Sequence, residues 1–216
     1  MFSHQGSLWL SWTISQYPAT EFRCILAYGK LVEGKDCWNI SQHFIPNYGQ
    51  NDFTGQEKNW AFVSKADKLY ALYLTFNEQQ IWLELDNGRV EEVHKSKALR
   101  WPYAAIHGGA ICEGTNGNLY HWFNSHTAHR DRSLDRYLVG VAELAGFPPF
   151  DMLRISSRPV LVGTEGVCLD KSPHFKSNVV FVCGAMKAAD NQWLVSFGQN
   201  DNKCCLVKLG LKDLKL

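Results

Sequence analysis

Polar and ionisable residues recur in this sequence where short apolar runs begin and where the following runs end. The starting positions are Glu57-Lys58-Asn59, His107-Gly108-Gly109 and Ser177-Asn178, and the ending positions are Asn77-Glu78, Asn124-Ser125-His126 and Gln199-Asn200-Asp201. Lysine attracts oxyanions, and histidine can donate or accept a proton near neutral pH. Side chains of this kind form a ligand site where a rigid scaffold brings them together.

A repeated hairpin pattern predicts how these residues are positioned. Four times, a turn cluster precedes two bulky apolar residues, and an aromatic residue stands three positions after the second of them. The repeats are Gly6-Ser7-Leu8-Trp9 with Trp12, Asp67-Lys68-Leu69-Tyr70 with Tyr73, Gly117-Asn118-Leu119-Tyr120 with Phe123, and Asn191-Gln192-Trp193-Leu194 with Phe197. Gly, Asn and Asp tolerate a tight reversal, and the runs that follow are rich in strand-forming residues. Each repeat therefore predicts a β-hairpin.

The spacing of these hairpins indicates an all-β chain built from repeated sheets. Few segments are helical in pattern, and sheets of about four strands at irregular intervals are typical of β-propeller blades. We predict a propeller of about four blades, the first of them partial, at residues 1–48, 55–98, 104–161 and 177–216. A β-sandwich is the competing architecture. In an antiparallel hairpin, the first strand begins on the rim where the second strand ends, so the polar positions should meet on one face.

Composition excludes several functional classes. Of the 216 residues, 45% are hydrophobic and the net charge is +1, without the basic stripe that a nucleic-acid surface needs. No apolar run approaches the roughly 20 residues that span a bilayer, and residues 1–6 lack the features of a signal peptide. The seven cysteines are odd in number and without C-x-x-C spacing, which argues against a disulfide framework or a zinc ribbon. Reduced thiols in a cytoplasmic protein are the simplest interpretation.

Several segments, taken in order, resemble one family of carbohydrate-active enzymes. They are Glu57-Lys58-Asn59-Trp60, Ile106-His107-Gly108-Gly109-Ala110-Ile111, the run from Leu119 to His126, Tyr137-Leu138-Val139-Gly140 with the run from Arg154 to Leu161, and Val179 to Gly184 with Val195 to Asp201. Over residues 55–208 this order resembles glycoside hydrolase family 130, the mannoside phosphorylases and hydrolases, which have a five-bladed propeller. The resemblance implies a glycoside or oligosaccharide ligand, bound or cleaved in a pocket on one propeller face.

The resemblance also implies roles for individual residues. Lys58 and Asn59 would lie in the pocket where the family binds phosphate or the adjoining sugar, with Glu57 beside them on the rim. His126 would donate or accept a hydrogen bond, and Asp201 would bind sugar hydroxyl groups. His107 departs from the family pattern, as a substitute ligand or as a local change. For each residue the alternative is a solvated loop position. No cofactor is expected, and inorganic phosphate would serve only as a co-substrate.

The family's E-D-P-R motif, which carries the expected proton donor, is absent from this chain. In the family it precedes a hairpin like that of residues 4–12, where this sequence has only Met1-Phe2. General acid catalysis of glycoside cleavage needs a well-placed carboxylic acid, and the remaining candidates are Asp52, Glu57, Asp131, Asp135, Glu143 and Asp201. Whether the chain is an enzyme therefore stays open.

Two interpretations of the missing motif remain. In the first, the catalytic strand lies in an upstream segment that completes the propeller. In the second, the chain is an inactive module that binds sugar or protein. Because an open propeller exposes strand edges, self-association is a further expectation.

Two other polar segments are interpreted as loops. His126 and His129 with Asp131 have no third metal ligand at a recognisable spacing, so we expect no metal site. Residues 163–166 lack the lysine and the following helix of a phosphate-binding loop.

Overall fold

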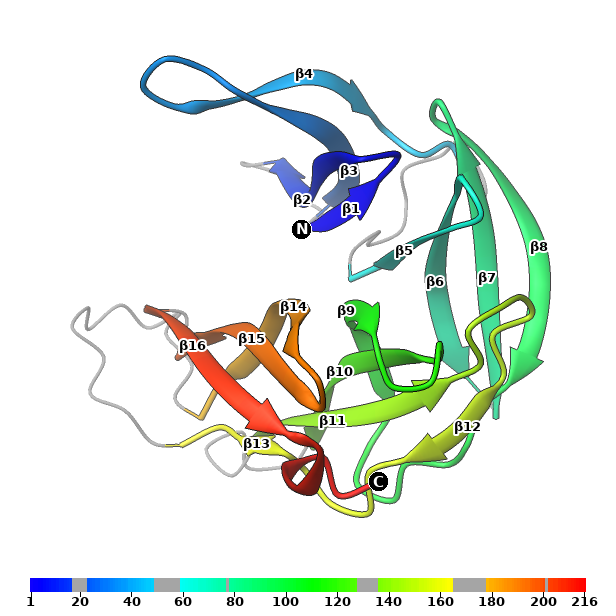
Figure 1. Ribbon diagram of the computed structural model, residues 1–216, viewed down its shortest axis with the longest axis vertical. Helices are drawn as coiled ribbons and strands as arrows, with labels where there is room; N and C mark the ends of the chain where they lie inside the picture. Colours follow the sequence, from blue (N-terminus) through cyan, green and yellow to red (C-terminus); the bar gives the residue numbers. More distant parts are fainter. Residues whose placement is uncertain (17–22, 49–58, 77, 128–135, 165–177, 201) are drawn as a thin grey trace.

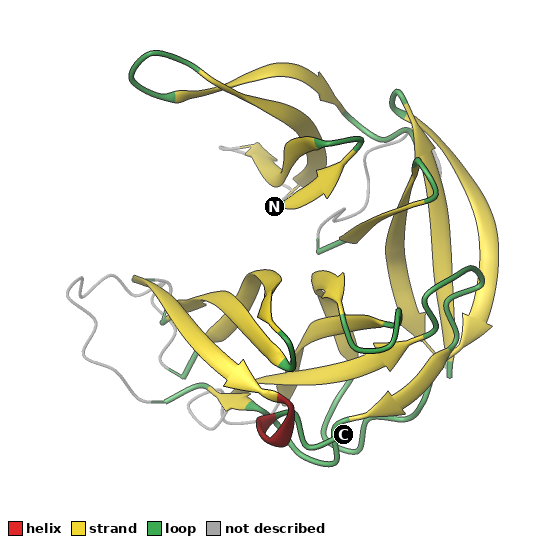
Figure 2. Ribbon diagram, in the orientation of Figure 1, coloured by secondary structure: helices red, strands yellow, loops and turns green. Residues whose placement is uncertain are grey.

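The computed structural model describes residues 1–16, 23–48, 59–76, 78–127, 136–164, 178–200 and 202–216. Within these ranges the chain forms four antiparallel sheets that follow one another around an open arc (Figure 1). The described part contains one helical turn, the 3-10 helix η2 (Leu211–Asp213), and is otherwise strands and loops (Figure 2). The predicted all-β propeller architecture is therefore confirmed.

Each sheet is a meander of consecutive strands. The first sheet consists of β1 (Phe2–His4), β2 (Ser7–Gln16), β3 (Arg23–Glu33) and β4 (Trp38–Phe44). The second consists of β5 (Ala61–Lys65), β6 (Lys68–Phe76), β7 (Gln79–Asp86) and β8 (Arg89–Lys97). The third consists of β9 (Ile106–Glu113), β10 (Leu119–Thr127), β11 (Arg136–Leu144) and β12 (Met152–Ile155), with β13 (Leu161–Val162) also paired to β11. The fourth consists of β14 (Val180–Ala189), β15 (Gln192–Gln199) and β16 (Lys203–Gly210).

The four predicted hairpins join the first and second strands of the four sheets. Their turns adopt the left-handed backbone that tight hairpins require. In the first sheet Gln5 and Gly6 have φ of 47° and 66°, and in the second Ala66 and Asp67 have φ of 50° and 60°. The innermost strand of the first sheet is short but reaches beyond Met1-Phe2, because β1 extends to His4, which pairs with Ser7.

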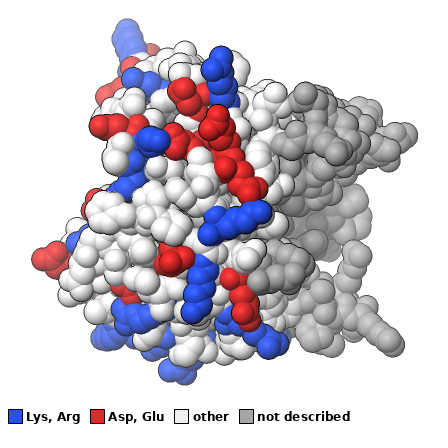
Figure 3. Space-filling model, turned by 90° about the vertical axis from the view of Figure 1, so that its right-hand side faces the viewer, with Lys and Arg blue, Asp and Glu red and all other residues white. Residues whose placement is uncertain are grey.

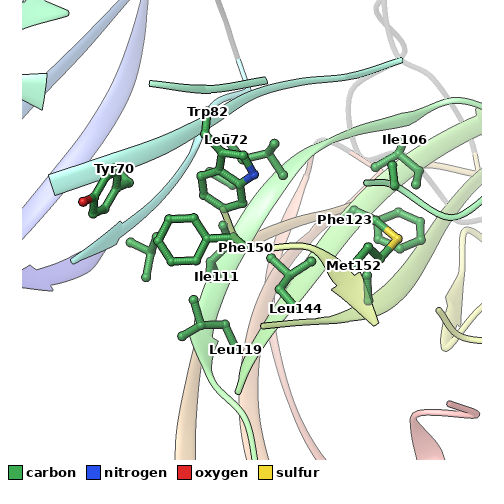
Figure 4. Close-up of a cluster of buried hydrophobic side chains, with 14 of the residues drawn as sticks. Tyr70, Leu72, Trp82, Ile106, Ile111, Leu119, Phe123, Leu144, Phe150 and Met152 are labelled. Carbon is green, nitrogen blue, oxygen red and sulfur yellow. The ribbon is translucent and has the colours of Figure 1, made fainter. Parts of the chain in front are cut away.

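Aromatic side chains fill three separate cores, one between each pair of neighbouring sheets. Trp82 is fully buried in the middle core, which Figure 4 shows, together with apolar side chains from the second and third sheets. Each core contains an aromatic pair that spans two sheets: Tyr28 with Phe62 at 5.6 Å between ring centroids, Trp82 with Phe150 at 4.5 Å, and Tyr120 with Trp193 at 4.9 Å. These cores hold the sheets in sequence order around the arc.

The first and fourth sheets are the two ends of the arc. Among the described residues, no core cluster joins one end to the other. Both end sheets carry exposed apolar side chains, which are Ile14, Trp38 and Ile40 on the first and Met186 and Leu206 on the fourth. The self-association expected from the open edges stays a prediction.

Candidate functional site

Three of the six predicted site residues have a described position. Glu57, Lys58 and Asp201 lie outside the described residues. Asn59 directly precedes Trp60 and strand β5, His107 is the second residue of β9, and His126 lies near the end of β10. The described part of the predicted site therefore consists of these three residues and their neighbours.

Strand registers bring the described rim residues to the same end of their sheets. In the third sheet, Asn124 near the end of β10 pairs with His107 at the start of β9. In the fourth sheet, Gln199 at the end of β15 pairs with Val180 at the start of β14. Both pairs follow the antiparallel rule that places the start of one strand beside the end of the next.

Asn59 and His107 line a common pocket between the second and third sheets. The pocket has a volume of about 170 Å³. Tyr73, Thr75 and His121 add further polar groups to its wall, while Leu72, Leu74 and Ile106 make the remainder apolar. Strands β6, β9 and β10 supply every lining residue except Asn59. Two sheets with a shared core therefore fix the pocket walls.

The close approach of two backbone segments shapes the mouth of this pocket. A Cβ atom on Gly108 would lie 1.4 Å from the carbonyl oxygen of Asn59, so only glycine fits at this position. The β9–β10 register shifts at the same place, where Phe123 pairs with Gly109 and Asn124 pairs with His107. Such a bulge redirects the side chains beside it and is common next to ligand sites. Asn59 itself has a φ of 67°, a left-handed conformation that asparagine tolerates.

His126 belongs to a different part of the third sheet. On β10, Tyr120 and Trp122 pack into the core shared with the fourth sheet, and alternation along the strand places His126 on that same face. Its ring lies 4.5 Å from that of Tyr137, between centroids. His126 does not line the pocket that contains Asn59 and His107. The described rim thus has two regions, one on each side of the third sheet.

Asn124 joins these regions through backbone hydrogen bonds. Its Nδ2 donates to the carbonyl oxygens of Gly108 at 3.1 Å and Val182 at 3.4 Å, and its Oδ1 accepts from the Val182 amide at 2.8 Å. The side chain is buried, so these bonds satisfy backbone groups of Gly108 in β9 and Val182 in β14. Asn124 therefore supports the rim rather than offering its amide to a ligand.

His121 is a pocket residue that the sequence analysis did not identify. It lies within β10 between Leu119 and Phe123, which belong to the apolar core shared with the second sheet. The side chain is fully buried, and burial lowers the pKa of its imidazole to about 3. A histidine at an apolar position of an alternating strand was the one signal that could have revealed it.

Of the six carboxylates considered as proton donors, only Glu143 is described. It lies on β11 at the end of the sheet opposite the pocket, since it pairs with Tyr120 near the start of β10. Its carboxylate accepts hydrogen bonds from Asn118 Nδ2 and Arg154 Nε, both at 2.6 Å. Glu143 is thus held in a structural network and is not placed to protonate a ligand at the rim.

Among the described thiols, burial raises the pKa of both Cys112 and Cys183. Cys112 is an unreactive thiol, because burial raises its pKa to about 12. No group of three or more potential metal ligands occurs within the described ranges. On the face drawn in Figure 3, Lys and Arg side chains are mixed with Asp and Glu. In the part of the chain that the structure covers, no helix has the length and hydrophobicity needed to cross a bilayer.

Solved structures with a similar fold include levansucrases and a GH43 protein. Levansucrase from Bacillus subtilis has a TM-score of 0.53 and 11% sequence identity, over 97% of this chain and 64% of that chain. Levansucrase complexed with sucrose has a TM-score of 0.52 at the same identity and coverage. The GH43 protein BlXynB from Bacillus licheniformis has a TM-score of 0.51 and 11% identity, over 95% of this chain and 39% of that chain.

This chain therefore spans less than two thirds of the length of these structures. No protein-family model matches the sequence, and no curated protein matches it. The likeness confirms the β-propeller fold that the resemblance implied. Membership of family 130 stays a prediction.

Proposed function

We propose that this chain is a carbohydrate-active module that binds a glycoside at the rim of its second and third sheets. The observation that carries the proposal is the pocket between these sheets, lined by Asn59 and His107, within a propeller-glycosidase fold. Polar groups on adjoining strand ends, combined with apolar walls, are the usual composition of a small-molecule site. Lys58, Glu57 and Asp201 are proposed to extend this site on the same rim.

A mannoside is the proposed sugar, on the strength of the ordered sequence segments that resemble family 130. Sucrose is the natural comparison, since one levansucrase structure of this fold is complexed with it. Inorganic phosphate is the proposed co-substrate if the module performs phosphorolysis. Hydrolysis and phosphorolysis both need a carboxylic acid at the rim. Glu143, the one described residue among the six candidate acids, does not supply it.

The first test is isothermal titration of the purified chain with methyl β-mannoside, β-1,4-mannobiose and sucrose, each with and without phosphate. We expect saturable binding of at least one mannoside. The absence of binding to all three sugars would contradict the proposal. Turnover of mannobiose, followed by product analysis with and without phosphate, then separates hydrolysis, phosphorolysis and binding alone.

Variants of the lining residues connect binding to the pocket. Asn59→Gly retains the left-handed backbone at φ 67° while removing the amide, and His107→Ala removes the imidazole. Each should weaken binding about tenfold, the effect of losing one hydrogen bond worth about 1.4 kcal/mol. Lys212→Gln, an exposed change on η2, is the matched control and should bind as the parent does. Unchanged affinity in both pocket variants would place the ligand elsewhere.

A further inference from the structure

A single histidine interrupts the apolar core beneath the pocket. Along β10, Leu119 and Phe123 face the second sheet and pack with its side chains, and His121 lies between them on the same face. The ring centroid of His121 is 5.8 Å from that of Phe123. The position thus has the surroundings of an apolar residue but carries two ring nitrogens.

Among the described residues, neither nitrogen of His121 has a hydrogen-bond partner. The side chain is 0% exposed, and both Nδ1 and Nε2 lack a donor or acceptor in the part of the chain that the structure describes. Buried polar atoms in native proteins are nearly always paired with protein, ordered water or a ligand, because an unpaired one costs free energy. Leucine or phenylalanine at this position would avoid that cost. We therefore expect the ring nitrogens of His121 to have a hydrogen-bond partner outside the described residues.

The pocket is the described space that His121 borders, and a partner that enters it reaches the buried nitrogens once the side chains around the ring shift. His121 borders the same 170 Å³ space as Asn59, Tyr73, Thr75 and His107. Complete small-molecule sites usually occupy about 300 to 1,000 Å³, so this space fits one end of a ligand rather than a whole oligosaccharide. Its walls combine hydroxyl, amide and imidazole groups with the apolar side chains of Leu72, Leu74 and Ile106.

The protonation state of His121 restricts the chemistry of that ligand. Burial keeps the imidazole neutral at physiological pH, since its pKa is lowered to about 3. A neutral imidazole presents one N–H donor and one acceptor nitrogen. A hydroxyl group matches both, because it donates one hydrogen bond and accepts two. A phosphate or carboxylate carries a negative charge that is costly to bury, and no Lys or Arg is among the described residues that line the pocket to balance it.

We propose that His121 and the pocket it borders form a subsite for one neutral, hydroxylated ring, in which the imidazole hydrogen-bonds ligand hydroxyl groups. The apolar wall formed by Leu72, Leu74 and Ile106 contacts the C–H face of that ring. The subsite excludes anions, so any phosphate co-substrate binds outside it. This inference rests on the proposed function and specifies which part of a glycoside the pocket between the second and third sheets receives.

Variants at position 121 test the subsite by titration with the glycoside that binds the parent chain most tightly. His121→Phe removes both nitrogens while keeping an aromatic ring and should weaken binding at least tenfold. His121→Gln keeps a donor and an acceptor and should stay within about threefold of the parent. His43→Phe, a change at an exposed histidine on β4, is the control and should leave affinity unchanged. The thermal midpoint of His121→Phe should equal or exceed that of the parent, because two unpaired nitrogens are removed.

Imidazole nitrogen spectra give a second readout that needs no folded variant. The nitrogen resonances of His121 should shift when methyl β-mannoside is added and should not shift with inorganic phosphate. Unchanged affinity in His121→Phe, or unmoved His121 resonances in the presence of a glycoside that binds, overturns the subsite and leaves the proposed function standing. A phosphate-induced shift also overturns it. If no glycoside binds the parent chain, both the subsite and the proposed function fail.

Discussion

The carbonyl oxygen of Asn59 lies where the side chain of residue 108 would begin. A Cβ atom on Gly108 would be 1.4 Å from that oxygen, and it would also meet the carbonyl carbon of Asn59 at 2.3 Å. The innermost strand of the third sheet therefore runs directly against the backbone that leads into the second sheet. This contact depends on glycine, and the pocket proposed to bind sugar is built around it.

Gly108→Ala is expected to destabilise the protein and to abolish glycoside binding. Because the obstructing atoms are backbone, relief requires the two sheets to move apart, and we expect the free energy of unfolding to fall by about 3 kcal/mol or more. Urea denaturation measures this change. Gly198→Ala is the matched control, since a Cβ there meets nothing within 4 Å, and it should change the free energy by no more than about 0.5–1 kcal/mol. Equal effects of the two variants would contradict the close approach.

Phe150→Ala should open a cavity in the middle core. Phe150 is fully buried and packs against Trp82 and Tyr70, with centroid distances of 4.5 and 5.2 Å. Truncating a buried phenylalanine costs about 3–5 kcal/mol, measurable as a lower denaturation midpoint. Phe147→Ala, three residues earlier, provides the comparison. Phe147 is 68% exposed, and its described ring contact is with the Lys65 ammonium group at 5.0 Å, worth about 0.5–1 kcal/mol.

Asn124 offers a test of how the third and fourth sheets are joined. Asn124→Leu removes all three of its hydrogen bonds and leaves buried backbone groups unpaired, so we expect a loss of about 2–4 kcal/mol in unfolding free energy. Asn124→Asp keeps the acceptor for the Val182 amide but turns a carboxylate toward the carbonyl oxygens of Gly108 and Val182.

The Asn124→Asp variant should respond to pH in a characteristic direction. Burial and the facing carbonyls favour the protonated acid, which can donate a hydrogen bond, so the pKa of the introduced carboxyl group would be higher in the folded chain than in the unfolded chain. Its stability relative to the parent should therefore improve as the pH falls toward 4, whereas the leucine variant should show no such gain. Guanidinium titrations at several pH values check this, and a pH-independent deficit would contradict it.

Buried His121 should make the parent chain less stable in mild acid. Because burial lowers its pKa from 6.5 to about 3, the unfolded chain binds a proton between these values while the folded chain does not. Stability is then lost as the pH falls through this window, by up to about 1.4 kcal/mol per pH unit.

The variant His121→Phe isolates this contribution. It lacks the titrating group, so its stability advantage over the parent should widen between pH 6.5 and pH 4. Other groups, such as His4, whose pKa is also lowered by burial, are common to both chains and cancel in the difference. A constant difference across this range would mean that His121 is protonated normally in the folded protein.

Local signals in the sequence were sufficient to predict the four hairpins and the all-β propeller architecture. Residues that adopt positive φ without large strain mark the hairpins, as Asn116 and Gly117 do before β10, and the runs that follow them alternate as strands do. The polar strand ends at His107 and Asn124 were predicted to lie together for the same reason, since antiparallel pairing requires it. These features depend on short stretches of chain, where residue type and spacing are informative.

The face on which each side chain lies could not be predicted in the same way. His126 and His121 lie on one strand but face different sheets, a distinction set by the cores on either side of β10. The role of Gly108 depends on a backbone segment nearly fifty residues earlier in the chain. Glu143 was a candidate acid by residue type. The β10–β11 register places it at the end of the sheet opposite the pocket, where it forms an ion pair with Arg154.

The three separate cores have a consequence for how this molecule loses structure. Because the described core clusters each join two neighbouring sheets, stability resembles a row of nearest-neighbour terms rather than one shared interior. The second and third sheets are held from both sides, whereas the outermost sheets are held from one and should open first, with the fastest amide exchange in β4 and β16. A sugar bound between the second and third sheets would then stabilise the interface between those two sheets. It would leave the opening of the first and fourth sheets almost unchanged.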